Sequence, residues 1–290
     1  RQAWAHAAGW AIIAWYGATL PCKCYFYRQT QIANMDIDPQ QLREQAIAVL
    51  DNNWNGRFTK PAPSLYPHQW NWDAGFIAIG NAHHNLERAM ADLRHLFSGQ
   101  WANGMLPQIV FGDDPNARYF PGPDFWQGHR SAHAPQRPAT SGISMPPVHG
   151  FVLWRLYELA ADKNAARAFL KEMYPKVMAL HRYLYTYRDP HEEGLVYIRH
   201  PWEGGTDNSP IWDAALARMA IDPDALPPYE RKDLQNPKAA AHRPTQQDYD
   251  RYVYLRRERS VLNNNNSNTN GTEGGGVSAA NNGEGIIESE

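Results

Sequence analysis

A run of fourteen residues, His200–Asp213, concentrates side chains that could hold a sugar and do acid chemistry on it. It contains two tryptophans, three carboxylates, two adjacent glycines and two prolines. Tryptophan faces suit the C–H faces of a sugar ring, and glycine lets the backbone come close to a ligand. A carboxylate that loses hydration among such groups can have its pKa raised enough to act as an acid near neutral pH.

The elements flanking this run favour Asp207 as the acidic group. Ser209 is a good N-cap and Pro210 suits the first position of a helix, so Asp207 is expected just before a helix N-terminus. Another interpretation remains open from the residues alone, namely a structural turn in which Trp202 and Trp212 belong to the core.

Composition excludes several classes of partner. The chain has 290 residues, with 28 basic and 30 acidic side chains, a balance that indicates neither nucleic acid nor a membrane surface as partner. Cys22 and Cys24 provide neither a disulfide framework nor a zinc site, and a reducing, cytoplasmic compartment is expected. His68, His83, His84 and His149 show no metal-ligand spacing, so we expect no metal and no cofactor.

The hydrophobic periodicity predicts an all-α fold. Apolar stripes at helical spacing follow Asp38 and occupy 86–97, 148–161 and 164–187. The helices come in pairs with long, polar or proline-rich loops between them, which is typical of helical hairpins. Residues 1–34 are expected to be an N-terminal extension. Residues 261–290, rich in Asn and Gly, are expected to be a disordered tail.

Five motifs in order resemble glycoside hydrolase family 63, and in particular its bacterial mannosylglycerate and glucosylglycerate hydrolases. They are Tyr66-Pro-His-Gln-Trp-Asn-Trp-Asp-Ala-Gly-Phe76, Gly104-Met-Leu-Pro-Gln-Ile-Val-Phe111, Met145-Pro-Pro-Val-His149, Trp202-Glu-Gly-Gly-Thr-Asp-Asn-Ser-Pro-Ile-Trp-Asp213 and Asp248-Tyr-Asp-Arg-Tyr-Val-Tyr-Leu255. The resemblance implies an (α/α)6 barrel over residues 35–260 and hydrolysis of an α-glycosidic bond with inversion. In such enzymes the Asp of the Gly-Gly-Thr-Asp-Asn-Ser-Pro motif is the general acid, which corresponds to Asp207.

The resemblance also implies a set of substrate-binding residues, namely Tyr66, Trp70, Trp72, Asp73, Gln108 and Gly205. The first four match the segment that lines the subsite for the non-reducing sugar. In the competing interpretation, Trp70 or Trp72 belongs to the core and Asp73 is an N-cap. Arg243 could pair with the carboxylate of a glycerate group, since a guanidinium binds carboxylates in a bidentate manner. The alternative for Arg243 is a solvated loop residue.

One departure from the family pattern affects catalysis. The family's general base is a glutamate near the C-terminus, whereas here the matching sequence ends near Arg256. Glu273, Glu284, Glu288 and Glu290 lack a family-like context, and Glu203 is expected to hydrogen-bond within its own loop.

We therefore expect an incomplete barrel, whose exposed apolar faces would favour a homo-oligomer. Three alternatives to hydrolysis of a glycerate glycoside stay open. They are sugar binding without cleavage, another (α/α)6 glycosidase of the trehalase or oligosaccharide glucosidase type, and a fragment that does not fold.

Overall fold

The computed structural model describes residues 38–189, 191–206, 209–234 and 243–255. The chain divides into two compact units, residues 1–48 and 49–290, and helix α3 (Pro39–Asn53) begins in the first unit and ends in the second. As predicted, Asp38 caps this helix, accepting a hydrogen bond from the Gln40 N–H at 2.9 Å. The apolar stripe predicted for α3 is not buried, since Leu42 and Val49 are 55% and 58% exposed.

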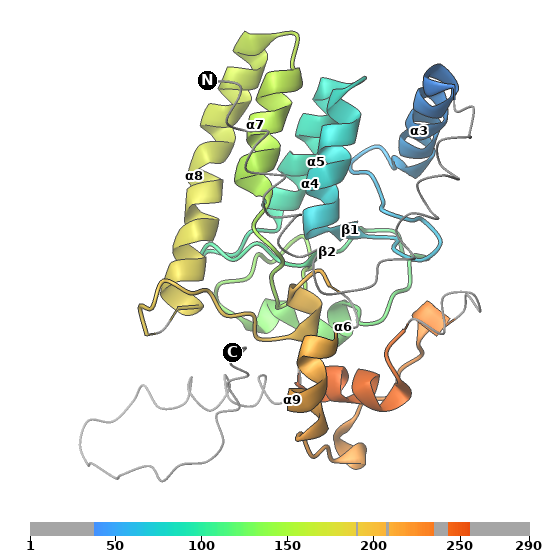
Figure 1. Cartoon of the computed structure of the whole chain (residues 1–290), viewed down its shortest axis with the longest axis vertical. Helices are drawn as coiled ribbons and strands as arrows, with labels where there is room; N and C mark the ends of the chain where they lie inside the picture. The colour runs from blue at the N-terminus through green and yellow to red at the C-terminus, as the bar shows by residue number, and fades with distance from the viewer. Residues whose placement is uncertain (1–37, 190, 207–208, 235–242, 256–290) are drawn as a thin grey trace, which may run out of the picture. The chain divides into compact units, whose positions relative to one another are not determined.

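Four helices form the main packed layer of the second unit, and they make two helical hairpins. They are α4 (Asn71–Ala82), α5 (Leu86–Ser98), α7 (His149–Leu159) and α8 (Lys163–Tyr187). Helix α4 packs against α5 and α7, and α7 packs against α8 (Figure 1). Asn85 and Asp162 cap α5 and α8 by accepting hydrogen bonds from backbone N–H groups of the first turns.

The interior of this layer is a continuous apolar cluster. Leu93 and Leu96 of α5, Val152 and Leu156 of α7 and Met173 of α8 are at most 1% exposed. Complete burial of one such side chain stabilises the fold by about 1.5–3 kcal/mol. The helical periodicity of the sequence therefore corresponds to the inward faces of these four helices.

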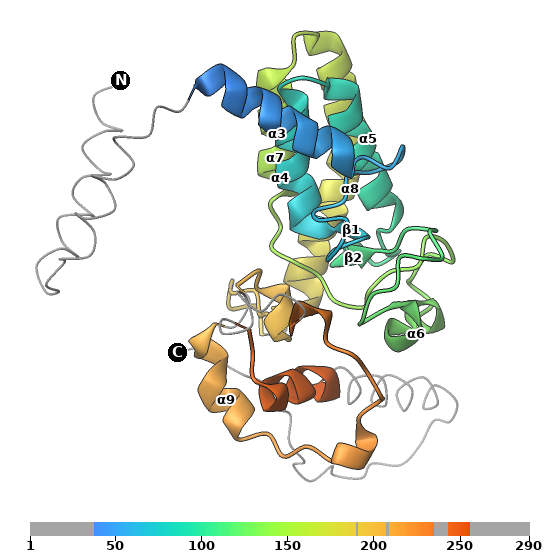
Figure 2. The ribbon, with the colours of Figure 1, turned by 90° about the vertical axis from the view of Figure 1, so that its right-hand side faces the viewer.

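A short strand pair carries the chain from this layer to the cavity described below. Strands β1 (Gln69–Trp70) and β2 (Ile109–Val110) are antiparallel, with Trp70 opposite Ile109 (Figure 2). Asn71 joins the start of α4 to the segment before β2, because its Nδ2 donates to the carbonyls of Leu106 and Pro107 at 3.2 and 2.9 Å. This clamp fixes the residues around Gln108 relative to α4.

The remaining described elements are short. They are α6 (Pro123–Trp126), η1 (Gly128–Arg130), η2 (Pro201–Glu203), η3 (Pro210–Trp212), α9 (Asp213–Ala217), η4 (Pro223–Ala225), η5 (Lys232–Leu234) and a helix over 246–255. Thr245 begins the last helix by accepting the Asp248 N–H at 3.2 Å. The helix expected to begin at Pro210 is instead a 3-10 turn followed by the short α9, and the Ser209 side chain makes no cap bond.

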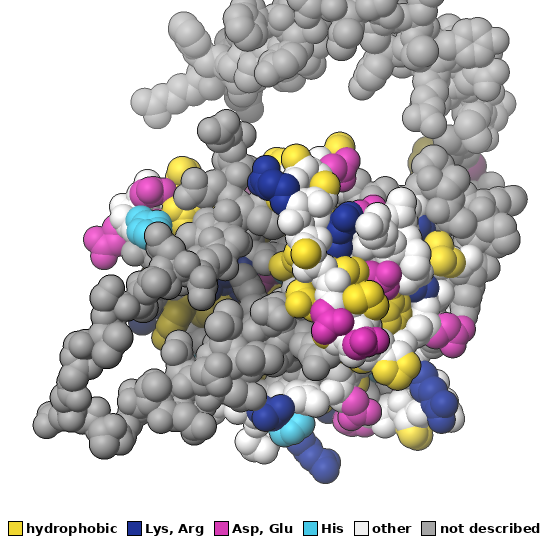
Figure 3. Space-filling view, turned by 90° about the horizontal axis from the view of Figure 1, so that it is seen from below, with side chains coloured by type: hydrophobic (Ala, Val, Ile, Leu, Met, Phe, Trp, Pro, Cys, Tyr) yellow, Lys and Arg dark blue, Asp and Glu magenta, His cyan; other side chains and the backbone are white. Residues whose placement is uncertain are grey.

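Helices dominate the described residues, whose two strands contain two residues each, so the all-α prediction is confirmed. Residues 1–34 and 261–290, predicted as an extension and a tail, lie outside the described residues. Seen from below, the described surface mixes acidic, basic and apolar side chains (Figure 3). No helix in the described ranges has both the length and the apolar character needed to cross a membrane.

Candidate active site

A cavity of about 110 Å³ opens in the second unit, and seven of its fifteen lining residues are aromatic. The aromatic residues that line it are Tyr66, Trp70, Tyr119, Phe120, Trp202, Tyr249 and Tyr252. Its polar and charged lining residues are Gln108, Asp233 and Arg243. Aromatic faces with a few fixed polar groups between them are what a small polyhydroxylated ligand needs for orientation.

The first wall of the cavity is built around Trp70 at the end of β1. The ring of Trp70 meets Tyr66 and Tyr119 edge-on, each with ring centroids 4.9 Å apart. Trp70 is only 7% exposed, so the part of it that faces the cavity is small. Edge-to-face contacts of this kind hold aromatic rings in fixed orientations, which makes this wall rigid.

Gln108 lines the cavity and has a buried amide oxygen. Its Nε2 donates to the Trp202 carbonyl at 3.1 Å, and this bond determines which end of the amide is the oxygen. Among the described atoms, no group donates a hydrogen bond to the buried Gln108 Oε1. A buried amide oxygen without a donor is costly, so Gln108 has an unsatisfied polar atom next to the cavity.

The opposite wall is formed by Trp202 in η2. Its ring packs against Trp126 on one side and against Tyr249 and Tyr252 on the other. His200 anchors it: Nδ1 accepts from the Trp202 N–H at 3.1 Å, and Nε2 lies 2.9 Å from the Tyr252 carbonyl. These contacts require the tautomer with the proton on Nε2. The sequence left open that both Trp202 and Trp212 belong to the core. Trp212 is buried, at 4% exposed, whereas Trp202 lines the cavity.

Trp72 and Gly205 come together, but they do not line the cavity. Gly205 has a φ of +65°, and a Cβ built there would lie 2.6 Å from Cη2 of Trp72. Two features therefore favour glycine at this position: the positive φ of the backbone and the indole that lies against it. Asp73 lies beside Trp72 in the first turn of α4 and is half-buried. Sugar contacts by Trp72, Asp73 and Gly205 stay predictions.

Glu203 is part of a buried ion pair and not a free carboxylate. It is 2% exposed and binds the Arg188 guanidinium with both oxygens, at 2.6 and 2.7 Å. Burial raises its pKa, but the charge and hydrogen bonds of Arg188, with backbone N–H groups of Arg199 and Ser144, outweigh burial and lower the pKa to about 2. The expected bond within the loop is present, since the Arg199 N–H donates to Glu203.

Asp207, the predicted general acid, lies outside the described residues. The cavity also contains lining residues that the sequence did not single out. Tyr249 and Tyr252 belong to one of the five motifs, whereas Tyr119 comes from an irregular segment and Asp233 from the 3-10 turn η5, neither with a recognisable signal. Arg231 binds both oxygens of Asp233, at 3.1 and 2.6 Å, and its guanidinium lies 4.4 Å from the centre of the Tyr249 ring.

Within the described residues there is no group of three or more His, Cys, Asp or Glu side chains placed to hold a metal ion. The site is therefore described by its aromatic walls, the Gln108 amide and the two charged residues Asp233 and Arg243.

Comparison with known proteins identifies the class of this fold and site as a glycoside hydrolase domain. The mannosylglycerate hydrolase MGH1-like glycoside hydrolase domain matches residues 66–277. The chain belongs to this family. The match extends past residue 260, where the predicted domain ends, so the predicted boundaries remain predictions.

The individual relatives agree with the family. The chain is 48% identical over 216 residues to a mannosylglycerate hydrolase of Rubrobacter radiotolerans, covering 74% of this chain and 48% of the relative. It is 42% identical over 230 residues to a glucosylglycerate hydrolase of Mycolicibacterium hassiacum, covering 77% and 51%.

A solved structure of the same family has a similar fold. It is the GH63 mannosylglycerate hydrolase of Thermus thermophilus in complex with Tris and D-glycerate. The match has a TM-score of 0.68 and 47% identity, and covers 77% of this chain and 51% of that structure. The helical fold fits an all-α toroid. The chain thus spans about half the length of the relatives it matches.

Proposed function

We propose that the aromatic cavity binds a small α-glycoside that carries a carboxylate, such as glucosylglycerate or mannosylglycerate, and that the glycosidic bond is hydrolysed there. The observation that carries the proposal is the lining of the cavity, in which seven aromatic residues stand beside the Gln108 amide and the Arg243 guanidinium. Aromatic faces suit a sugar ring, and a guanidinium suits a carboxylate. The names of the relatives, which are hydrolases of two glycerate glycosides, support the same substrate class.

The proposed reaction proceeds with inversion. Asp207 gives its proton to the glycosidic oxygen as the bond to the anomeric carbon breaks. A second carboxylate, about 6.5–9.5 Å from the acid in inverting enzymes, takes a proton from the water that attacks the opposite face. The residue that acts as this base is not assigned. Glu203 does not fit the role, because Arg188 and two backbone N–H groups occupy its oxygens.

Arg243 is the proposed partner for the glycerate carboxylate. It lines the same cavity as Tyr66 and Gln108, which supports this role over that of a solvated loop arginine. A guanidinium forms strong charge-assisted hydrogen bonds with a carboxylate. Asp233 lines the cavity as well, and its bonds to Arg231 balance its negative charge beside the anion.

Binding without cleavage is a second candidate function, and one observation favours it. Among the described residues that line the cavity, Asp233 is the one carboxylate, and Arg231 binds both of its oxygens. The two candidates share the cavity and differ only in whether a base is present.

The balanced composition gives no reason to propose nucleic acid or a membrane surface as partner, and we propose a cytoplasmic location with a small molecule as ligand. A homo-oligomer is also proposed. The exposed Phe151 and Trp154 of α7 would supply apolar surface for it.

Sugar release from glucosylglycerate and mannosylglycerate tests the proposal, with Asp207→Asn as the control and NMR of the first-formed anomer as the readout for inversion. Release of the β-anomer by the wild type, lost in the variant, supports hydrolysis. Binding without release supports the second candidate. A folded chain that neither binds nor cleaves contradicts both candidates.

A further inference from the structure

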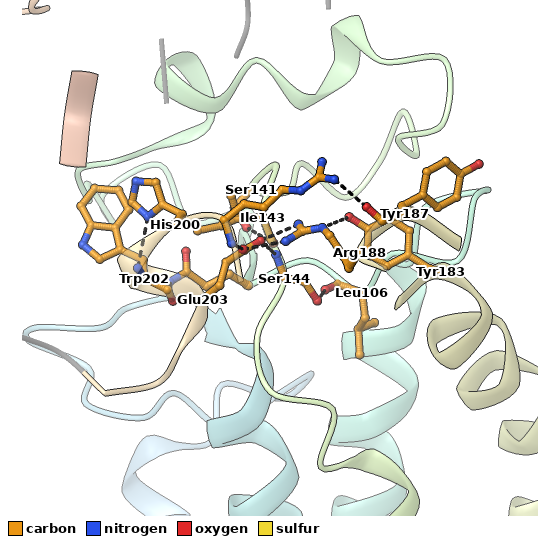
Figure 4. Close-up of polar contacts among 12 residues, drawn as sticks. Leu106, Ser141, Ile143, Ser144, Tyr183, Tyr187, Arg188, His200, Trp202 and Glu203 are labelled. Atoms are coloured by element: carbon orange, nitrogen blue, oxygen red, sulfur yellow. Dashed lines mark hydrogen bonds and ion pairs between the residues drawn. The ribbon is translucent and has the colours of Figure 1, made fainter. Parts of the chain in front are cut away.

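Four hydrogen-bond donors from three separate parts of the chain converge on the Glu203 carboxylate (Figure 4). Two come from the guanidinium of Arg188, the residue directly after α8. The other two are the backbone N–H groups of Ser144 and Arg199, at 3.1 and 2.7 Å. One side chain therefore joins the end of α8, the segment before α7 and the segment that leads into η2.

The residues on either side of Glu203 form the walls described above. Trp202 lines the cavity, and its carbonyl accepts a hydrogen bond from the Gln108 Nε2. Gly205, two residues after Glu203, lies against the indole of Trp72. A change in the position of Glu203 would therefore move one cavity wall and the acceptor that orients Gln108.

We propose that Arg188 and Glu203 are positioning residues, which hold the segment 202–205 so that Trp202 and Gln108 present a preformed wall to the ligand. This inference rests on the function proposed for the cavity. It assigns to Glu203 a role distinct from both acid and base, because its oxygens are fully engaged with protein donors.

The attraction between the two charges alone does not account for such an arrangement. Replacing a buried ion pair by apolar residues of similar volume is often neutral or stabilising. An apolar pair at these positions would, however, leave the Ser144 and Arg199 N–H groups without their acceptor. The carboxylate is therefore needed to hold backbone at this place, and the guanidinium keeps the carboxylate ionised and oriented.

Three variants are compared with the wild type. The first is an apolar double variant that combines Arg188→Met and Glu203→Leu. The second is the single variant Glu203→Gln, and the third is the control Asp92→Asn. Asp92 is also a fully buried carboxylate that accepts a backbone N–H, from Thr59 at 2.6 Å, but it lies in α5 and does not line the cavity. Three quantities are measured for each protein: the Tm, the Kd for glucosylglycerate and mannosylglycerate, and the 19F NMR spectrum after labelling with 5-fluorotryptophan.

We expect both Glu203 variants to shift or broaden the 19F signals of Trp202 and Trp72, assigned through Trp202→Phe and Trp72→Phe, and to leave that of the exposed Trp154 unchanged. The Kd should weaken on the order of tenfold, which corresponds to about 1.4 kcal/mol of binding free energy. The double variant should keep this weak Kd even where its Tm equals that of the wild type. Asp92→Asn should lower the Tm without changing the Kd or the two signals.

Unchanged Trp202 and Trp72 signals in a folded double variant would overturn the positioning role, as would an unchanged Kd. The 19F readout needs no ligand, so it decides the inference even where the wild type binds neither glycoside. That last result would count against the proposed function alone.

Discussion

The backbone of Gly205 lies directly against the indole of Trp72, so that a Cβ at residue 205 would come within 2.6 Å of Cη2 and 2.7 Å of Cζ2. The contact joins two segments that are far apart in the sequence. One is the first turn of α4, and the other is the Gly-Gly segment that follows Glu203. The contact leaves no room for a side chain at the second glycine of this motif.

Gly205→Ala should therefore destabilise the protein by more than backbone strain alone. An alanine with positive φ costs about 1–2 kcal/mol, and the clash with Trp72 adds to it. Gly194→Ala is a matched control, since Gly194 also has positive φ but a Cβ there would meet no heavy atom within 4 Å. Urea unfolding measures both variants. Equal losses would contradict the contact, and Trp72→Leu should partly restore the stability of Gly205→Ala.

Gln108→Met should weaken glycoside binding by about 1–3 kcal/mol, because it removes the uncharged polar side chain that lines the cavity. Isothermal titration calorimetry with glucosylglycerate measures the loss. Gln100→Met is the control: Gln100 donates to the carbonyls of Gly104 and Lys176, and it does not line the cavity. An equal loss of affinity in both variants would mean that Gln108 acts only through the stability of the fold.

Arg243→Gln should reduce affinity for a glycerate glycoside by roughly 1.5–3 kcal/mol and leave affinity for its methyl ester nearly unchanged, since only the free acid carries the carboxylate that pairs with the guanidinium. Arg218, an exposed residue that does not line the cavity, provides the control Arg218→Gln. The prediction fails if acid and ester lose affinity equally.

Protonation of the buried Asp92 carboxyl should stabilise the native state, by an amount that decreases as the pH rises. Burial, partly offset by hydrogen bonds from Thr59 and Asn81, raises the pKa of Asp92 to about 6 from 3.8. The native state thus binds the proton more tightly than the unfolded state. The contribution is fully present below pH 3.8 and is lost as the pH rises through about 6, a change of about 3 kcal/mol.

Comparing the wild type with Asp92→Asn at each pH separates the contribution of Asp92 from those of other titrating groups. His149 works in the opposite direction, because burial lowers its pKa to about 4 and its contribution is lost as the pH falls from 6.5 through 4. The unfolding free energy of the wild type minus that of Asp92→Asn should therefore fall between about pH 4 and pH 7. A difference that stays constant or rises over this range would show that Asp92 does not titrate as described.

The sequence predicts the helical part of this fold well because local signals decide it. Asp38, Asp162 and Thr245 each begin a helix as cap residues, and the apolar stripes of 86–97, 148–161 and 164–187 face the shared core, whereas that of α3 does not. The strand pair at Trp70 has only two residues in each strand, and its pairing depends on a partner far along the chain, at Ile109. Periodicity does not reveal contacts of that kind.

The cavity is predictable only in part, for the same reason. Motifs in the sequence point to Tyr66, Trp70 and Gln108, and all three line it. Asp233 reaches the cavity from the short 3-10 turn η5, where no periodicity or motif marks it. The role of Glu203 could not be read from its neighbours in sequence, because its partner Arg188 comes from the end of α8.

The central claim is that the cavity between Trp70 and Trp202 binds a glycerate glycoside. Calorimetric titration of the folded chain with glucosylglycerate and mannosylglycerate, each with Gln108→Met alongside, tests it most directly. We predict saturable binding of one ligand per chain that is weaker in the variant. A folded chain that binds neither compound, or binds them equally well with and without the Gln108 amide, would contradict the claim.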